Sequence, residues 1–140
     1  MNYTHLRDVM EMVIQARVRP KMQPFEWLGV LLYLEKKGWL KVFTDDGGRV
    51  IAATAAYRVK EFKQKAKDKI PEREEGNILF VPFFVSVADD RMEVPRIIKK
   101  YLSENPEIKE VVFEDKNNRV RRFRRDRHGE EQETQLAASA

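Results

Sequence analysis

The chain has 140 residues, of which 42% are hydrophobic and 36% are charged, and its formal net charge is +4. This length suits one domain with a single core. The sequence contains no cysteine, which excludes a disulfide framework, a thiolate nucleophile and a cysteine-ligated metal site. The longest apolar run, from Ile78 to Ala88, contains Pro82 and is too short to span a bilayer. We therefore expect no membrane association and a cytoplasmic protein, or one packaged from the cytoplasm into a virion.

Positive charge is concentrated near the C-terminus. Positions 116 to 127 hold seven cations and one carboxylate, a net charge of +6, which leaves −2 for the rest of the chain. Segregated charge of this kind favours an anionic partner, either nucleic acid or an acidic protein surface. The residues predicted to bind such a polyanion are Lys116, Arg119, Arg121, Arg122, Arg124, Arg125 and Arg127.

Two helices are predicted at the start of the chain. Thr4 suits an N-cap, and apolar residues repeat at helical spacing from there until Pro20 ends the run. Pro24 can open a second helix, and Gly38 supplies a left-handed C-terminal stop. Within this second helix, predicted over residues 24–37, the buried stripe is expected to consist of Leu28, Leu31 and Leu32.

A β-hairpin is predicted after the helices. Its strands cover residues 39–44 and 49–59, joined by Asp45-Asp46-Gly47-Gly48, whose glycines can take the positive φ angles of a tight turn. The second strand carries four alanines, and side chains this small let a helix or a ligand approach the sheet, with close packing as the expected cause. The highly charged residues 60–77 predict an exposed loop or a short surface helix.

A central strand and a helix are predicted next. Residues 78–87 are apolar on both faces, as in a strand buried on both sides, and Pro82, which cannot donate a ladder hydrogen bond, predicts a bulge. Asp89 and Asp90 follow as helix caps, because no third ligand at suitable spacing accompanies them for a metal. The helix begins at position 91 or 95 and ends at 103, before Asn105-Pro106.

The chain is predicted to close with two strands and a tail. The strands cover residues 108–114 and 119–125, separated by a polar turn. The second of them has cations on both faces, which is typical of a strand at the edge of a sheet. Residues 129–140 are polar and small and are expected to form a disordered tail.

The order of these elements predicts an α+β fold with a mixed, mostly antiparallel sheet flanked by helices. Residues 1–128 would form one domain that ends in the basic hairpin. This order resembles the GNAT acyltransferase fold. Within that superfamily the chain from residue 39 to 129 looks most like the toxin-activating lysine acyltransferases, with WLKVFTDDGGRVIAATAAYRV similar to their first hairpin, ILFVPFFVSVADD to their central strand, and IKEVVFEDKNNRV to their closing elements.

The resemblance implies an acyl-transfer reaction and a thioester substrate, either acyl-coenzyme A or an acyl carrier protein. In the GNAT fold the pantetheine arm binds the backbone of the central strand, and the pyrophosphate binds the amide groups at the start of the following helix. The matching positions here are Phe84, Val85, Ser86 and Val87 on the strand, and Arg91 in the segment after it. The candidate catalytic residues are His5 as a general base and Tyr101 as the acid that protonates the leaving thiolate.

Two classes of function remain open at this stage. The segment ADDRMEVP stands where the fold has a glycine-rich pyrophosphate loop, and its two carboxylates repel phosphate. The first hypothesis is an acyltransferase of this fold, active or descended from active enzymes. The alternative is a non-catalytic binding or assembly protein, such as a phage-type structural or accessory protein, that holds nucleic acid or another subunit through its basic strand. A third interpretation of the arginines is structural, with Glu110, Glu114 and the acidic tail as their ion-pair partners.

Overall fold

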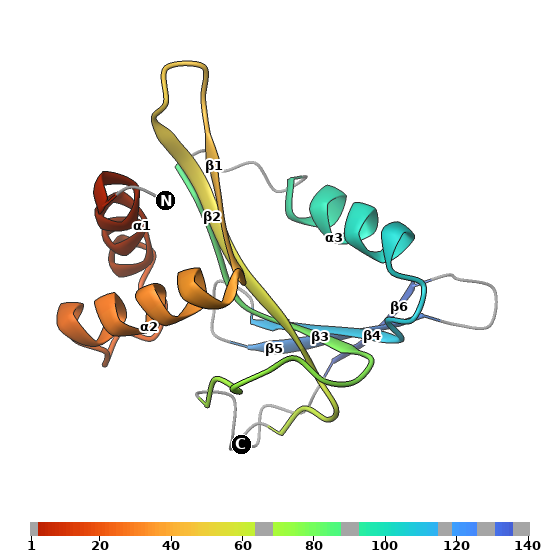
Figure 1. Ribbon diagram of the computed structural model, residues 1–140. Coiled ribbons are helices and arrows are strands. Elements are labelled where there is room, and N and C mark those ends of the chain that lie inside the picture. Colours follow the sequence, from red (N-terminus) through yellow and green to blue (C-terminus); the bar gives the residue numbers. More distant parts are fainter. Residues whose placement is uncertain (1–2, 64–68, 88–92, 115–118, 126–130, 136–140) are drawn as a thin grey trace. The chain divides into compact units, whose positions relative to one another are not determined.

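The computed structural model describes residues 3–63, 69–87, 93–114, 119–125 and 131–135 (Figure 1). In chain order its elements are α1 (Tyr3–Gln15), α2 (Pro24–Lys37), β1 (Leu40–Thr44), β2 (Val50–Val59), β3 (Ile78–Ser86), α3 (Glu93–Glu104), β4 (Glu110–Glu114), β5 (Val120–Arg125) and β6 (Glu131–Gln135).

The strands of the described chain form a mixed sheet in the order β1-β2-β3-β4-β5-β6. The pair β3/β4 is parallel, whereas β1/β2, β4/β5 and β5/β6 are antiparallel. A parallel pair requires a crossover, and α3 supplies it. The predicted α+β fold with a mixed, mostly antiparallel sheet is therefore confirmed in its element order and in the described pairings.

Contacts between residues divide the chain into two compact units. The first unit contains Met1–Ala55 and Phe83–Asp90, and the second contains Ala56–Pro82 and Arg91–Ala140. Strands β2 and β3 contribute residues to both units, so the boundary crosses the sheet within these strands. The expectation of one domain over residues 1–128 stays a prediction. No helix in the described part of the chain is both long enough and apolar enough to cross a membrane.

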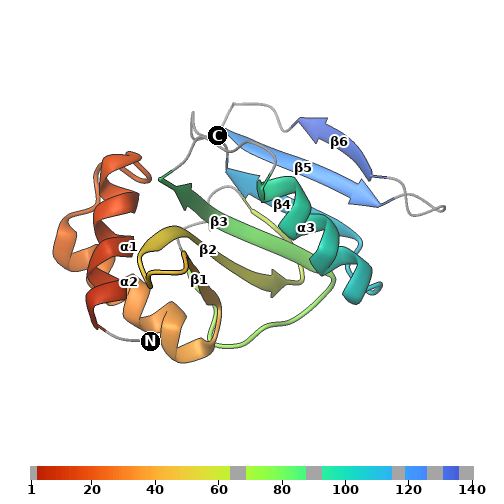
Figure 2. The same ribbon diagram turned by 90° about the horizontal axis from the view of Figure 1, so that it is seen from above.

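In the first unit, α2 has the predicted bounds, because both of its ends are specified locally. A capping box joins Gln23 and Glu26 at the N-terminus, with Pro24 in the first turn. At the C-terminus Gly38 takes a left-handed conformation with φ of 77°, and its N–H donates to the carbonyl oxygen of Glu35. Helices α1 and α2 lie side by side, as Figures 1 and 2 both show.

The predicted buried stripe of α2 is wrong at two of its three residues. Leu31 is fully buried, but Leu28 and Leu32 are 41% and 43% exposed. The inward face instead consists of Trp27, Leu31 and Leu34, at the spacing i, i+4, i+7, and the Trp27 ring packs edge-on against Phe83 with centroids 5.9 Å apart. Leu28 and Leu32 each follow an inward residue by one position, which rotates them by about 100° away from the core.

The hairpin of β1 and β2 forms as predicted. The Asp45 carboxylate accepts hydrogen bonds from the N–H groups of Gly47 and Arg49, both at 2.9 Å, and Gly48 takes a φ of 80°. The alanines of β2 pack closely, because Ala52, Ala53 and Ala55 are at most 1% exposed. The small side chains of these alanines thus allow close packing in this unit.

The charged segment after β2 is a loop where the structure describes it. It ends at Gly76, which has a φ of 88°. A Cβ atom there would lie 2.6 Å from the Cα of Lys60 and 2.6 Å from the carbonyl oxygen of Val59, so the close approach of the two backbones requires glycine. Ile78, the first residue of β3, follows two positions later.

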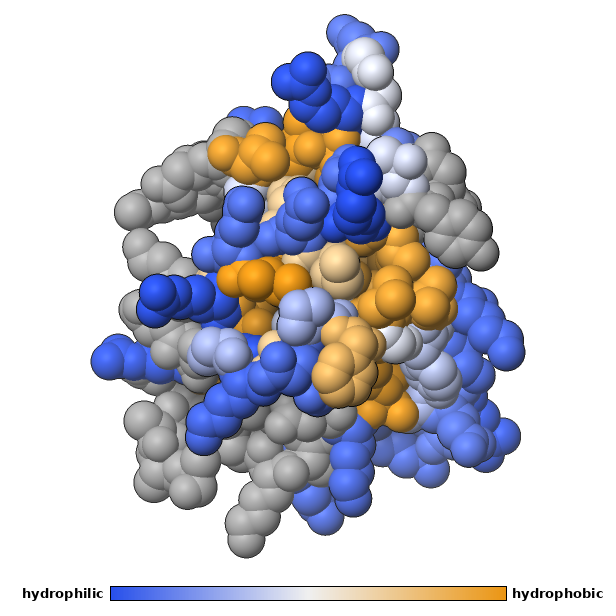
Figure 3. Space-filling view, turned by 90° about the vertical axis from the view of Figure 1, so that its left-hand side faces the viewer, coloured by the Kyte–Doolittle hydropathy of each residue, from blue (hydrophilic) through white to orange (hydrophobic). Residues whose placement is uncertain are grey.

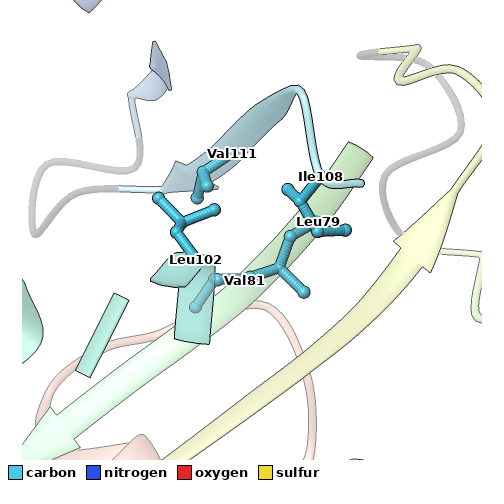
Figure 4. Packing of buried hydrophobic residues seen from close by; sticks show 5 residues of the cluster. All are labelled: Leu79, Val81, Leu102, Ile108 and Val111. Atoms are coloured by element: carbon cyan, nitrogen blue, oxygen red, sulfur yellow. The ribbon is translucent and has the colours of Figure 1, made fainter. Parts of the chain in front are cut away.

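The core of the second unit lies between α3 and the strands β3 and β4. Five buried side chains meet there: Leu79 and Val81 of β3, Leu102 of α3, Ile108, and Val111 of β4 (Figure 4). Helix α3 ends where the sequence predicts, and the side-chain amide of Asn105 donates to the carbonyl oxygen of Tyr101 at 2.8 Å. The helix is held on this face by its apolar side and by this closing turn.

Strand β5 is not an edge strand, contrary to the prediction. Residues Glu131–Gln135, expected in a disordered tail, form β6 and pair antiparallel with β5. The register sets Glu131 opposite Arg125. An unpaired strand presents a row of backbone donors and acceptors, which explains why the following segment adds to it as a strand. The remaining residues of the expected tail lie outside the described residues.

Candidate functional site

In the first unit, one edge of the β3 backbone faces β2. The carbonyl oxygen of Phe83 accepts a hydrogen bond from Thr54 Oγ1 at 2.9 Å, and the N–H of Val87 donates to the carbonyl oxygen of Ile51 at 2.9 Å. Thr54 and Ile51 belong to β2. Because backbone groups alternate between the edges along a strand, the odd-numbered residues here face β2. The N–H and C=O groups of Phe84 and Ser86 therefore point to the opposite edge.

Pro82 explains where the ladder on that opposite edge ends. The register of β3 with β4 runs from Ile78 opposite Glu110 to Val81 opposite Phe113. β3 itself continues as one strand through Pro82, and the bulge expected there stays a prediction. By the same alternation Pro82 belongs to the edge that faces β4, and proline has no N–H to donate.

The predicted thioester-binding residues thus divide into two pairs. Phe84 and Ser86 are half-buried and direct their backbones to the edge of β3 beyond the described register with β4. Val85 and Val87 face β2 with their backbones, and their side chains are 4% and 66% exposed. Arg91, predicted to contact a pyrophosphate, lies outside the described residues. The role of all these residues in binding stays a prediction.

Tyr101, the predicted acid, belongs to a polar cluster in the second unit. Arg58 Nε donates to Tyr101 Oη at 3.4 Å, and Arg58 Nη2 donates to Asn105 Oδ1 at 2.9 Å and to the carboxylate of Glu107. Arg58 lies on β2, and its three partners lie at and after the C-terminal end of α3. Sequence analysis did not single out Arg58, because its partners are more than 40 positions away and no local pattern connects them.

The Arg58 guanidinium and the Glu107 carboxylate each stabilise the charged form of the other. The hydrogen bond to Tyr101 is the largest cause that raises the pKa of Arg58 above its ordinary value, and the contacts with Glu107 act in the same direction. The pKa of Glu107 is lowered, first by a hydrogen bond from its own backbone N–H and then by Arg58. The cluster therefore fixes a full positive charge beside the phenol of Tyr101.

His5, the predicted base, has a structural contact in the first unit. Its Nε2 donates to the carbonyl oxygen of Gly48 at 3.2 Å, which connects α1 to the β1–β2 turn. That contact accounts for a histidine at this position without any catalysis. A role of His5 as a base stays a prediction.

Two of the arginines on β5 converge on one carboxylate. Arg122 forms an ion pair with Glu110 of β4, and both side chains are largely buried, at 16% and 12% exposure. Arg124 approaches the second oxygen of Glu110 at 3.8 Å and is 60% exposed. The guanidinium of Arg122 also lies 6.0 Å from the centre of the Phe62 ring. This agrees with the structural interpretation of these arginines.

Arg125 closes the C-terminal end of α3. Its guanidinium donates to the carbonyl oxygens of Leu102 at 2.8 Å and Pro106 at 3.2 Å. The last carbonyl groups of a helix have no partner within the helix, so a cation there satisfies them and opposes the helix dipole. Arg119 and Arg121 also have interactions, and Lys116 and Arg127 lie outside the described residues. Most of the described basic strand is therefore occupied within the molecule.

One cavity of the second unit was not anticipated from the sequence. It has a volume of about 260 Å³ and an aromatic lining that includes Tyr57, Phe62 and Phe80. The ring of Phe62 lies 5.0 Å from that of Phe80. Pockets that enclose drug-sized ligands span about 300–1,000 Å³, so this cavity is too small for a nucleotide cofactor such as coenzyme A.

Comparison with known proteins gives similarities at the level of the fold. No protein-family model matches the chain, and no curated protein matches it. A solved structure of GphF, a GNAT-like decarboxylase in complex with isobutyryl-CoA, is similar with 17% sequence identity and a TM-score of 0.49, over 81% of this chain and 62% of that chain. Tetrahymena GCN5 is similar with 15% identity and a TM-score of 0.46, over 83% of this chain and 64% of that chain. The chain thus spans less than two thirds of either neighbour, and the fold assignment rests on the order and pairing of its elements.

Proposed function

We propose that this protein binds an acyl thioester along β3 and transfers the acyl group to an amine. The observation that carries the proposal is that the described register of β3 with β4 ends at Val81, so that the backbone of Phe84 lies beyond it, on the edge that faces away from β2. The pantetheine arm of such a thioester carries two amide groups. It can therefore pair with a strand edge as a short additional strand would.

The chemistry requires a proton donor for the departing thiolate. The amine nitrogen attacks the thioester carbonyl carbon, the C–S bond breaks, the nitrogen loses a proton and the sulfur gains one. We assign the second proton to Tyr101, because the Arg58 guanidinium 3.4 Å from its hydroxyl oxygen would stabilise the phenolate left behind. Asn105 and Glu107 hold Arg58 in place for this task.

Binding is tested by thermal unfolding in the presence of coenzyme A, acetyl-coenzyme A and octanoyl-coenzyme A. A ligand at about a hundred times its Kd adds about 2.7 kcal/mol of stability, which raises the Tm by several degrees in a domain of this size. Phe84→Pro removes the N–H at the edge of β3 and leaves the groups that face β2, whereas Phe84→Ala keeps this N–H. We expect Phe84→Ala to keep the response to thioesters and Phe84→Pro to lose it. The reverse order would contradict the proposal.

Transfer is tested by the release of free thiol from the thioester in the presence of a lysine-containing peptide. Tyr101→Phe should lower kcat by about 10²-fold or more, as expected for loss of a general acid, with little change in KM. Thiol release that is equally fast without the amine, or a Tyr101→Phe variant with unchanged kcat, would contradict the assigned step.

The alternative function is binding to a polyanion through β5. It is tested by the same thermal-unfolding measurement with a short DNA duplex at low and moderate salt. Binding that falls steeply with salt and a missing response to every thioester would make it the better account. The exposed guanidinium of Arg124 is the described group on β5 best placed for such contacts.

A further inference from the structure

The cavity of the second unit has the features of a small-ligand site, and the proposed acyl transfer does not use it. Its volume of about 260 Å³ exceeds the roughly 150 Å³ of an apolar cavity that accepts benzene. Exposed apolar side chains also lie among charged ones on the side of α1 and α2 (Figure 3), but the cavity is hollow and can take up a ligand. Its volume has room for one aromatic ring or a chain of about six carbons.

Aromatic rings line the cavity from the two strands and from the loop after β2. Tyr57 of β2 and Phe80 of β3 are 1% and 2% exposed, and their rings meet edge-on with centroids 5.7 Å apart. Phe62 of the loop lies against Phe80, with 5.0 Å between centroids and 42° between ring planes. Ile70 and Pro71 add further apolar surface. The apolar part of a ligand would therefore exchange water for contacts with rings and aliphatic groups.

The end of this loop is fastened to β2. The backbone N–H of Arg58 donates to the Glu74 carboxylate at 3.2 Å, and the N–H of Glu75 donates to the carbonyl oxygen of Arg58 at 3.3 Å. The ammonium of Lys60 also pairs with the Glu75 carboxylate at 3.2 Å. A cavity whose walls are held in this way is largely formed before a ligand arrives, so binding costs less ordering entropy.

The charge around the cavity is positive. Among its described lining residues, Glu61 and Lys63 form an ion pair at 3.1 Å. The ammonium of Lys69, which also lines the cavity, has no ion-pair partner in the described part of the chain. In the sequence, residues 60–69 contain five lysines and two carboxylates, a net charge of five minus two, or +3. This charge favours an anionic ligand.

A cationic ligand is disfavoured, although aromatic rings can bind cations. The guanidinium of Arg122 already lies 6.0 Å from the centre of the Phe62 ring, and its carboxylate partner is Glu110. A second cation at that ring would meet like charge from Arg122 and from Lys69.

We propose that this cavity binds a small organic carboxylate, with its apolar ring or chain against Phe62 and Phe80 and its carboxylate paired with Lys69. One ammonium group beside apolar walls suits a monoanion with an apolar body better than it suits a phosphate, which bears more charge. The bound molecule is a free acid, and this inference does not depend on the proposed acyl transfer.

Isothermal titration calorimetry of the full chain tests the binding. The ligands are phenylacetate and hexanoate, each compared with its own neutral amide. We expect at least one carboxylate to bind with a Kd on the order of 1 mM or lower, and its amide to bind at least about threefold more weakly. A response to phenylacetate alone or to hexanoate alone identifies the apolar part as a ring or a chain. No binding of either carboxylate at about ten times the expected Kd, or equal binding of acid and amide, would overturn the proposal.

Three variants locate the site. Lys69→Gln should raise the Kd of the carboxylate about threefold to tenfold and leave that of the amide unchanged, because only the charge pair is lost. Lys21→Gln removes an exposed lysine of the first unit and is the matched control, which should leave the Kd unchanged. Ile70→Trp should fill the cavity and weaken acid and amide alike by about tenfold or more, and it should keep the Tm because Ile70 is only partly buried. An unchanged Kd in Lys69→Gln or Ile70→Trp, or an equal loss in Lys21→Gln, would overturn the proposal.

Discussion

Strand β5 and helix α2 use their side chains in opposite ways. On β5, the guanidinium groups of Arg122 and Arg125 are bound within the molecule, by Glu110 and by the end of α3. On α2, Leu28 and Leu32 remain exposed although the opposite face of the same helix is completely buried. The charged element is thus largely satisfied internally, and the apolar element exposes one face within the described part of the chain.

This difference teaches that the chemical type of a side chain does not identify its partner. A run of arginines favours a polyanion only where their donors are not already in use, and a run of leucines favours the core only on the face that turns inward. The backbone of β3 at Phe84 is the region for which a ligand is proposed above. The largest cluster of charge on the chain is a weaker candidate.

The largest effect is expected from breaking the ion pair between Arg122 and Glu110. Arg122→Met leaves a carboxylate at 12% exposure without its main cation, which should lower the free energy of unfolding by about 3 kcal/mol. Adding Glu110→Leu should recover most of this loss, since two apolar side chains can replace a buried pair. Urea unfolding of the two single variants and the double variant measures the coupling. Additive losses would show that the pair is not an internal unit.

Leu31→Ala and Leu32→Ala compare the two faces of α2 directly. Leu31 is fully buried, and its truncation should cost about 2–3 kcal/mol. Leu32 is 43% exposed, so the same truncation should change the stability of the monomer by less than about 0.5 kcal/mol. Equal losses would mean that the two faces are not distinct.

Arg125→Gln tests whether Arg125 of β5 stabilises the C-terminal end of α3. The substitution removes the cation from the carbonyl oxygens of Leu102 and Pro106, and a loss of about 1–2 kcal/mol is expected from hydrogen bonds with a charged donor. Arg124→Gln is the matched control, because its side chain is 60% exposed and should cost little. Amide hydrogen exchange near the end of α3 should increase in the first variant only.

The smallest effect is expected at acidic pH. The pKa of Glu107 is lowered in the folded protein, so its contribution to stability is present above its ordinary value of 4.5 and is lost as the pH falls through the folded pKa. Arg58 is charged throughout this range and adds no pH dependence there. As the pH falls below 5, the Glu107→Gln variant should therefore lose less stability than the wild type does. The remaining slope should include Glu75, whose pKa is lowered chiefly by Lys60.

The sequence predicts this fold best where structure is specified locally. The bounds of α2 follow from Pro24 and Gly38, and the first hairpin follows from the Asp45 turn, because in each case the determining residues are neighbours in the chain. The inward face of α2 is not local. Eight of its fourteen residues are apolar or aromatic, and the position of Phe83, more than 50 positions later, decides which of them turn inward.

The candidate site shows the same limit. The sequence places Phe84 and Tyr101 in the expected elements, but which backbone groups of β3 face away from β2 depends on the register with β2. Arg58 was missed because its contacts with Tyr101 and Glu107 exist only once β2 and the end of α3 are side by side. The strand β6 was missed because its sequence is polar and gains its structure from the edge of β5.

The central claim is that β3, and not β5, binds the ligand. Its most direct test is an assigned amide NMR spectrum recorded while the protein is titrated with acetyl-coenzyme A and, separately, with a short DNA duplex. The account predicts saturable shifts at the amide of Phe84 and its neighbours with the thioester, and no comparable shifts over Val120–Arg125. Shifts confined to β5, with DNA alone and with no response of Phe84 to the thioester, would contradict it.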